Sequence, residues 1–131
     1  MREMLASGLV ELCAHTVTHT IATVLPNDML HDELTRSKEE LEQFCGREVV
    51  CFCYPNGEEG DFDARTTEAV KRMGHKLALT AVEGTNPFPF DPYLIRRIHA
   101  HEVMSVFEKD ASGLGDFQKR LKGWVSLDKA G

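Results

Sequence analysis

Two histidines separated by three residues are the side chains of this chain best suited to chemistry. His15 and His19 follow a short apolar segment, and on a helical turn their spacing would place both rings on one face. Two neutral imidazoles in that arrangement can hold one divalent cation. A hydrolytic metal needs a third protein ligand, most often a carboxylate, and an open position for water. The spacing therefore predicts part of a metal site.

The composition is typical of one globular domain. The 131 residues are 42% hydrophobic and 27% charged, which predicts a single domain over residues 1–131 with a modest buried core. The formal net charge of −6 argues against nucleic acid or an anionic membrane as the main partner. No apolar run is long enough to span a bilayer, and the N-terminus lacks the layout of a secretion signal. The absence of such a signal and the reduced cysteines expected from the sequence favour a cytoplasmic location, but the sequence leaves the location unknown, and an exported parent protein is the alternative.

The four cysteines are expected to be reduced and buried. Cys51 and Cys53 alternate on an expected strand, so both side chains point to one face, and a bond between them would strain the strand. Together with Cys13 and Cys45 they do not form the spacing of a disulfide framework. The alternative is a soft-metal or redox site built from Cys51, Cys53 and a histidine, which would make the chain a cysteine-based metal or thiol protein.

Helical and strand patterns alternate along the chain. Helices are expected at 2–7, from a cap at Asn27 or Asp28 to 45, from a cap at Asp63 to 73, and within 105–121. Strands are expected at 9–13, 49–54, 77–82 and 93–98. Strands separated by helices predict an α/β fold with a mostly parallel sheet and right-handed crossovers. Chemistry in such folds gathers at the carboxyl ends of the strands, where the two histidines and the turn after 49–54 both fall.

Three motifs occur in order along these elements. Residues 15–19 read His-Thr-Val-Thr-His, residues 52–57 read Phe-Cys-Tyr-Pro-Asn-Gly, and residues 90–98 end in Leu-Ile-Arg-Arg-Ile. They resemble the H-[ST]-x-x-H motif, the strand-end Phe-x-x-Pro-x-Gly motif and the late Leu-Pro-Arg-Ile segment of polysaccharide deacetylases that share the NodB homology domain. The resemblance extends from residue 2 to residue 107.

The resemblance implies a fold and a reaction. It implies a distorted barrel of alternating strands and helices, here incomplete. It also implies zinc or another divalent metal, with zinc expected, held by an aspartate together with His15 and His19. The implied reaction is hydrolysis of N-acetyl groups on a polysaccharide or glycan. The metal polarises the acetyl carbonyl and activates water, a carboxylate takes the proton of that water, and a general acid protonates the departing amine.

The resemblance also implies roles for five residues around the strand ends. The backbone N–H near Asn56 would stabilise the oxyanion, Arg97 would hold a carboxylate, His99 (or His101) would be the general acid, and Tyr54 and Pro55 would contact substrate. Each role has a structural alternative. Residues 54–56 would form only a plain turn, Arg97 would be an exposed arginine at a strand edge, and His99 and His101 would be surface histidines.

The family's first motif, an Asp-Asp pair that supplies the third ligand and the base, has no match in this chain. Two explanations stay open: the chain is the C-terminal portion of a longer enzyme and inactive alone, or it is a short relative that binds carbohydrate or acts as a scaffold without catalysis. The acidic residues Glu58, Glu59, Asp61 and Asp63 could replace a missing ligand, or simply cap a helix. Four or five strands cannot close a barrel, so an open sheet with exposed edges is expected, and such edges promote homo-oligomers.

Overall fold

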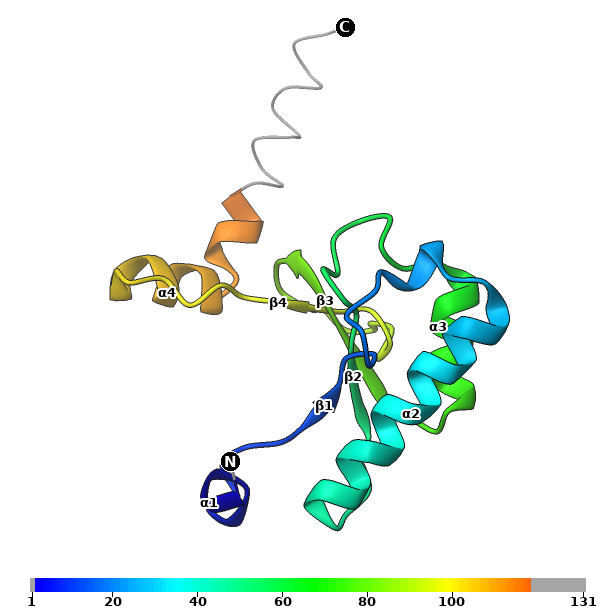
Figure 1. Cartoon of the computed structure of the whole chain (residues 1–131). Helices are drawn as coiled ribbons and strands as arrows, with labels where there is room; N and C mark the ends of the chain where they lie inside the picture. Colours follow the sequence, from blue (N-terminus) through cyan, green and yellow to red (C-terminus); the bar gives the residue numbers. More distant parts are fainter. Residues whose placement is uncertain (1, 119–131) are drawn as a thin grey trace, which may run out of the picture.

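The computed structural model describes residues 2–118, in which helices separate β1 from β2 and β2 from β3, whereas a loop without a helix joins β3 to β4 (Figure 1). The strands are β1 (Cys13–Ala14), β2 (Cys51–Cys53), β3 (Leu77–Glu83) and β4 (Ile95–Arg97), and they are hydrogen-bonded in that order, each neighbouring pair parallel. The helices are α1 (Arg2–Ala6), α2 (Asn27–Cys45), α3 (Ala64–Arg72) and α4 (Met104–Ala111), with a 3-10 turn, η1, at Ala22–Val24. The predicted α/β architecture with a parallel sheet is confirmed, and the described sheet is an incomplete barrel.

Parts of the sequence predictions lie outside this range. The end of the helical region expected at 105–121 falls beyond residue 118, so the prediction of one domain over residues 1–131 stays a prediction. No helix among residues 2–118 has the length and apolar character needed to cross a membrane. Strands β1 and β4 are the outer strands of the described sheet, and homo-oligomer formation through such edges also stays a prediction.

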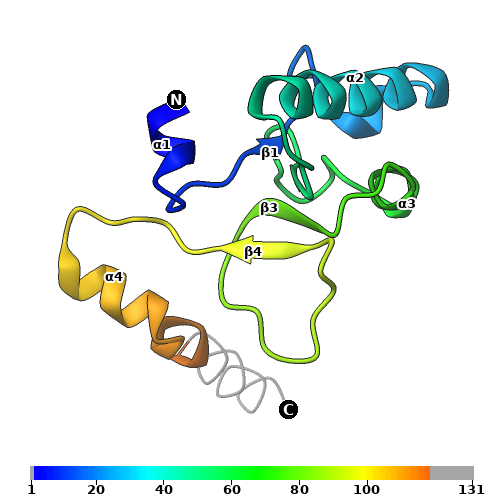
Figure 2. The same cartoon turned by 90° about the horizontal axis from the view of Figure 1, so that it is seen from below.

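Helices α2 and α3 lie side by side over one face of the sheet (Figures 1 and 2). On that face Ala14, Phe52 and Ala78 are register partners on three neighbouring strands, and all three are fully buried. The helices contribute the buried side chains Leu30 and Leu34 from α2 and Val70 from α3. Each large apolar side chain removed from water in this layer stabilises the fold by about 1.5–3 kcal/mol. This core fixes the positions of the strand ends.

The two long helices begin differently. Asp63 forms the predicted cap of α3: its side chain accepts a hydrogen bond from the Thr66 N–H at 2.7 Å, and the Thr66 hydroxyl accepts one from the Asp63 N–H at 2.8 Å. The predicted cap of α2 by Asn27 or Asp28 is wrong. The helix begins after Pro26 without a side-chain cap, because the Asn27 side chain instead accepts a hydrogen bond from Arg65 of α3 at 3.0 Å.

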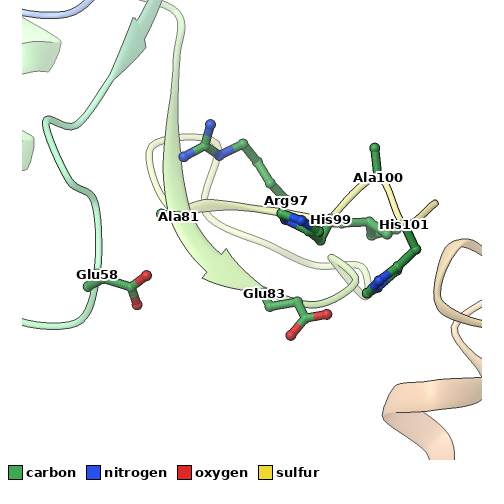
Figure 3. Close-up of a pocket in the computed structure, with 8 residues that line it drawn as sticks. Glu58, Ala81, Glu83, Arg97, His99, Ala100 and His101 are labelled. Atoms are coloured by element: carbon green, nitrogen blue, oxygen red, sulfur yellow. The ribbon is translucent and has the colours of Figure 1, made fainter. Parts of the chain in front are cut away.

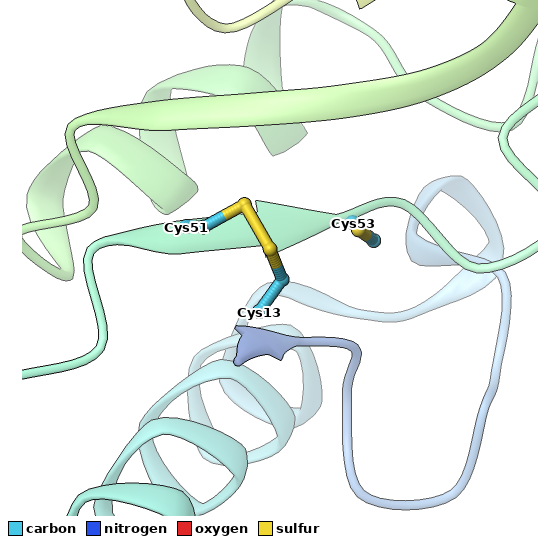
Figure 4. A group of neighbouring side chains, drawn as sticks. All are labelled: Cys13, Cys51 and Cys53. Atoms are coloured by element: carbon cyan, nitrogen blue, oxygen red, sulfur yellow. A yellow bond between two sulfur atoms is a disulfide. The ribbon is translucent and has the colours of Figure 1, made fainter. Parts of the chain in front are cut away.

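The expectation of four reduced cysteines is wrong for two of them. Cys13 and Cys51 form a disulfide (Figure 4), with their Cα atoms 4.5 Å apart. They are direct partners in the parallel register of β1 and β2. The alternation of Cys51 and Cys53 excludes only a bond within one strand, whereas pairing of neighbouring strands joins cysteines 38 positions apart. Cys45 and Cys53 are free, and the expectation of a cytoplasmic location loses the support of fully reduced cysteines.

Candidate metal and catalytic site

The two motif histidines meet at the carboxyl end of β1. Their ring centroids lie 4.7 Å apart at an interplanar angle of 73°. The connecting residues do not form the helical turn expected from the spacing. Instead, Thr16 (φ 58°) and His19 (φ 60°) adopt left-handed backbone conformations in a loop. A β-branched residue rarely takes a positive φ, and holding one there costs about 1–3 kcal/mol, so the surrounding structure must enforce this loop.

The hydrogen bond of His15 orients its ring. The Nδ1 atom of His15 lies 2.8 Å from the carbonyl oxygen of Cys53, at the end of β2. A carbonyl only accepts, so Nδ1 must carry the proton, and Nε2 of the neutral ring is then left with a lone pair. A backbone carbonyl bonded to the second ring nitrogen is the usual support of a metal-ligating histidine. The donor set therefore fits a divalent cation.

A buried glutamate of α2 holds the histidine loop in place. Glu33 is 9% exposed. It accepts hydrogen bonds from the backbone N–H groups of Val17 (2.7 Å) and Thr18 (3.0 Å) and from the Thr18 hydroxyl (2.9 Å). Burial by itself raises the pKa of this carboxyl, but the bonds from Thr18 and Val17 outweigh burial and lower the pKa below its ordinary value. Sequence reasoning missed Glu33, although its place between Leu30 and Leu34 on the buried face of α2 was a usable signal.

The turn after β2 is rigid. Asn56 (φ 60°) and Gly57 (φ 76°) both have left-handed conformations. The Gly57 carbonyl accepts a hydrogen bond from the Ala81 N–H of β3 at 2.7 Å, and the Asn56 side chain donates to Asp61 at 2.6 Å. The backbone of this turn is thereby fixed at the same edge of the sheet as the histidine loop. Such a turn can present a backbone N–H to an oxyanion.

A cavity of about 600 Å³ opens at the ends of β3 and β4 (Figure 3). Its charged and imidazole lining residues are Glu58, Glu83, Arg97, His99 and His101. The structure thus brings the predicted residues Arg97 and His99 into one cavity, and neither motif histidine is among the described residues that line it. The Arg97 Nε–H donates to the carbonyl oxygen of Thr80, which anchors the side chain on β3. Arg97 also acts electrostatically on Cys53, whose pKa is raised by burial and partly lowered by this guanidinium.

The acidic loop after β2 has mostly structural roles. Asp63 caps α3, and Asp61 accepts hydrogen bonds from Asn56 and from the Glu58 N–H. Glu58 borders the cavity, whereas Glu59 is exposed. This distribution favours the solvated, capping interpretation of the loop over that of a substitute ligand.

Potential metal ligands cluster at two other places. Among residues 2–118, the groups of three whose ligand atoms lie within 4.8 Å of one another are Cys13, Cys51 and Cys53, and Glu83, His101 and Asp110. Neither group contains His15 or His19. The described residues therefore supply two imidazoles to the histidine site and no clustered third ligand.

Comparison of the sequence with known protein families agrees with the geometry of the histidine site. The family model described as polysaccharide deacetylase matches residues 1–78, which include the histidine motif and the turn after β2. The chain belongs to this family. The family assignment made from the three motifs is confirmed. No curated protein matches this chain.

Solved deacetylases share the fold of this family member. It is similar to the Streptococcus pyogenes deacetylase PplD in complex with acetate (25% identity, TM-score 0.69, 76% of this chain and 42% of that one). It is also similar to the Bacillus cereus polysaccharide deacetylase BC0361 (28%, 0.68, 86% and 34%). IcaB from Ammonifex degensii, at 23% identity and TM-score 0.67, has the same fold over 85% of this chain and 49% of its own. The chain thus spans between a third and a half of the length of these structures.

Two residues assigned to substrate in this deacetylase-family chain have buried side chains. Tyr54 is 1% exposed, and its hydroxyl lies 3.3 Å from the Thr67 hydroxyl and 3.2 Å from the Tyr93 carbonyl oxygen. Its ring packs against Phe52, and Pro55 is also fully buried. The Tyr54 side chain therefore belongs to the core. The role of Tyr54 and Pro55 in binding substrate stays a prediction, and it would have to be exerted by the backbone of the turn.

Glu33→Gln should destabilise the protein by about 2 kcal/mol, because an amide group replaces a charged acceptor of three hydrogen bonds. Urea denaturation at pH 7 measures the loss. Glu39→Gln, at an exposed position of the same helix, should change the free energy of unfolding by less than about 0.5 kcal/mol. Equal stability of both variants would show that Glu33 does not hold the histidine loop.

Proposed function

We propose that this chain forms part of a metal-dependent hydrolase that removes N-acetyl groups from a polysaccharide or glycan by cleaving a carbon–nitrogen bond outside a peptide. One observation carries the proposal: His15 and His19 lie together, and the Cys53 carbonyl fixes the His15 tautomer that leaves Nε2 available to a metal. Family membership supports the reaction class. The similar streptococcal deacetylase was solved with acetate, the acid that such hydrolysis releases.

His15 and His19 would hold the divalent ion, and zinc suits a site of neutral imidazoles and carboxylate. When bound, the ion would polarise the acetyl carbonyl and activate water. The third ligand and the general base are carboxylates in this scheme. The 131 residues contain no Asp-Asp pair, so we assign both carboxylate roles to residues outside the described histidine site.

The remaining steps use the strand-end residues of this chain. The Asn56 backbone N–H, held in the rigid turn, would donate to the oxyanion that develops on the acetyl oxygen. His99 lines the cavity together with Arg97, where a protonated imidazole would donate a proton to the departing amine. Arg97, whose orientation is fixed by Thr80, would hold a carboxylate that enters this cavity.

Zinc titration of the full chain with its Cys13–Cys51 disulfide intact tests the histidine site. We expect weak binding, because two imidazoles leave most of the coordination sphere to water, and affinity at least about tenfold lower in His15→Ala and in His19→Ala. His31→Ala, which removes an exposed histidine of α2, should bind zinc as the unaltered protein does. Unchanged binding in both motif variants would refute the assignment of the ligands.

Measurement of carbohydrate binding distinguishes a metal-dependent hydrolase from a non-catalytic scaffold protein. For an N-acetylated chitooligosaccharide, we expect binding that weakens when zinc is removed by a chelator and in His15→Ala, and no appreciable acetate release by this chain alone. Binding of equal strength without zinc and in His15→Ala would instead support a non-catalytic carbohydrate-binding protein. Acetate release above a zinc-free control would retain the hydrolase and place the base within this chain, with Glu58 at the cavity as the first candidate.

A further inference from the structure

Three cysteines gather on the face of the sheet opposite α2. Phe52 points into the core under the helices, so its strand neighbours Cys51 and Cys53 project to the other face. Cys13 joins them from β1, where it is the register partner of Cys51 (Figure 4). The three sulfur atoms lie within 4.8 Å of one another. The proposed hydrolysis uses the backbone carbonyl of Cys53, but neither it nor the family assignment uses the three sulfur atoms.

The spacing of the sulfur atoms suits a metal ion after a small adjustment. Zinc–sulfur bonds of about 2.3 Å with tetrahedral angles place pairs of sulfur atoms about 3.8 Å apart. The third sulfur, on Cys53, is already within 4.8 Å of the other two. Opening the disulfide would let Cys13 and Cys51 separate to the same spacing by rotation of their side chains. The strand pair itself can remain in register, because all three ligands come from β1 and β2.

We propose that, in the reduced protein, Cys13, Cys51 and Cys53 together bind one thiophilic d10 metal ion, of the class of zinc(II) or copper(I). Reduction by a dithiol supplies two electrons and two protons, which break the sulfur–sulfur bond and leave two thiols while the dithiol closes into a cyclic disulfide. Binding of the ion by three thiolates then releases three protons to solvent. In the oxidised protein two of the three ligands are consumed by the disulfide, so the redox state switches the site on and off.

The surroundings of the three cysteines favour the binding of such a metal ion. Cys51 is 6% exposed, whereas Cys13 and Cys53 are half-buried, so the cluster is in partial contact with solvent, from which an ion and a fourth ligand would come. Three thiolates with a divalent ion carry a net charge of −1. The Arg97 guanidinium acts electrostatically on Cys53 and would offset part of that charge. The inference stands independently of the deacetylase proposal.

Cadmium(II) is the probe, since its thiolate complexes give a strong ultraviolet charge-transfer band. After reduction with a phosphine, one equivalent of cadmium should saturate the band in the full chain, and the oxidised protein should give none. Cys13→Ser, Cys51→Ser and Cys53→Ser should each lose about a third of the intensity or more and at least about tenfold in affinity. Cys45→Ser, at the free cysteine that ends α2, should keep both the intensity of the band and the affinity for cadmium.

Two further measurements protect the test against misfolded variants and against the histidine site. In the reduced unaltered protein, cadmium should slow alkylation of Cys13, Cys51 and Cys53 but not of Cys45, as read by mass spectrometry of the labelled peptides. His15→Ala and His19→Ala should leave the band unchanged. A full-sized band in Cys13→Ser, absence of a band in the reduced protein, or equal protection of Cys45 would each overturn the proposal.

Discussion

Replacement of Gly57 by alanine should lower the free energy of unfolding by about 3 kcal/mol and displace the turn that carries Asn56. A Cβ atom at Gly57 would lie 2.8 Å from the Ala81 backbone nitrogen and 3.0 Å from the Tyr54 carbonyl oxygen. Both neighbours are backbone atoms of the sheet or the turn, so neither can move aside as a flexible side chain would. The Gly57 φ of 76° adds a conformational cost for any residue with a side chain.

Urea denaturation measures this loss, and Gly46→Ala provides the matched control. Gly46 ends α2 with a φ of 70°, close to that of Gly57, but a Cβ there meets nothing within 4 Å. The Gly46→Ala variant should therefore lose only about 1 kcal/mol of its free energy of unfolding, the cost of holding a residue with a side chain at a positive φ. The difference between the two variants isolates the contact between the turn and β3. Equal losses would show that the turn tolerates a side chain and is not fixed by its close approach to Ala81.

Local sequence patterns predicted the elements because their determinants lie within a few residues of each other. The apolar periodicity of α2 stops at Gly46, where the structure shows a left-handed residue, and the cap of α3 is formed by Asp63 and Thr66 only three positions apart. The predicted side-chain cap of α2 does not form, and the Asn27 side chain is instead bonded to Arg65, 38 positions away. That partner is set by packing of two helices, which no local pattern records.

The difference between partners near in sequence and partners distant in sequence also explains which features of the histidine site could be predicted. The motif spacing correctly brought His15 and His19 together, but it attributed their contact to a helical turn. The actual loop depends on Glu33, which reaches it from α2 and accepts hydrogen bonds from the backbone N–H groups of Val17 and Thr18. The Cys13–Cys51 disulfide likewise follows from strand register, a property of the folded sheet. Residues whose partners are distant in sequence were thus the ones that sequence reasoning missed.

Acidification from pH 6.5 to 4 should destabilise the protein by about 3 kcal/mol through a single histidine, His75. This side chain is 2% exposed and its ring lies 5.6 Å from that of Phe52 in the core. Burial, aided by the positive charge of Lys38, lowers its pKa from 6.5 to about 4. Between these two values the unfolded chain binds a proton that the folded protein does not, so stability is complete above pH 6.5 and falls with pH down to 4.

Urea denaturation at a series of pH values in this window tests the assignment. The stability of His75→Phe, which keeps a ring beside Phe52 but removes the titrating group, should depend less on pH by the stated amount. His31→Phe, at an exposed position of α2, should retain the full slope. Glu33 and Glu42 have pKa values lowered from 4.5, so their contributions begin to be lost only at the acidic end of this window, and the comparison between His75→Phe and His31→Phe removes them. An unchanged slope in His75→Phe would therefore mean that a group other than this buried imidazole limits the acid stability of the fold.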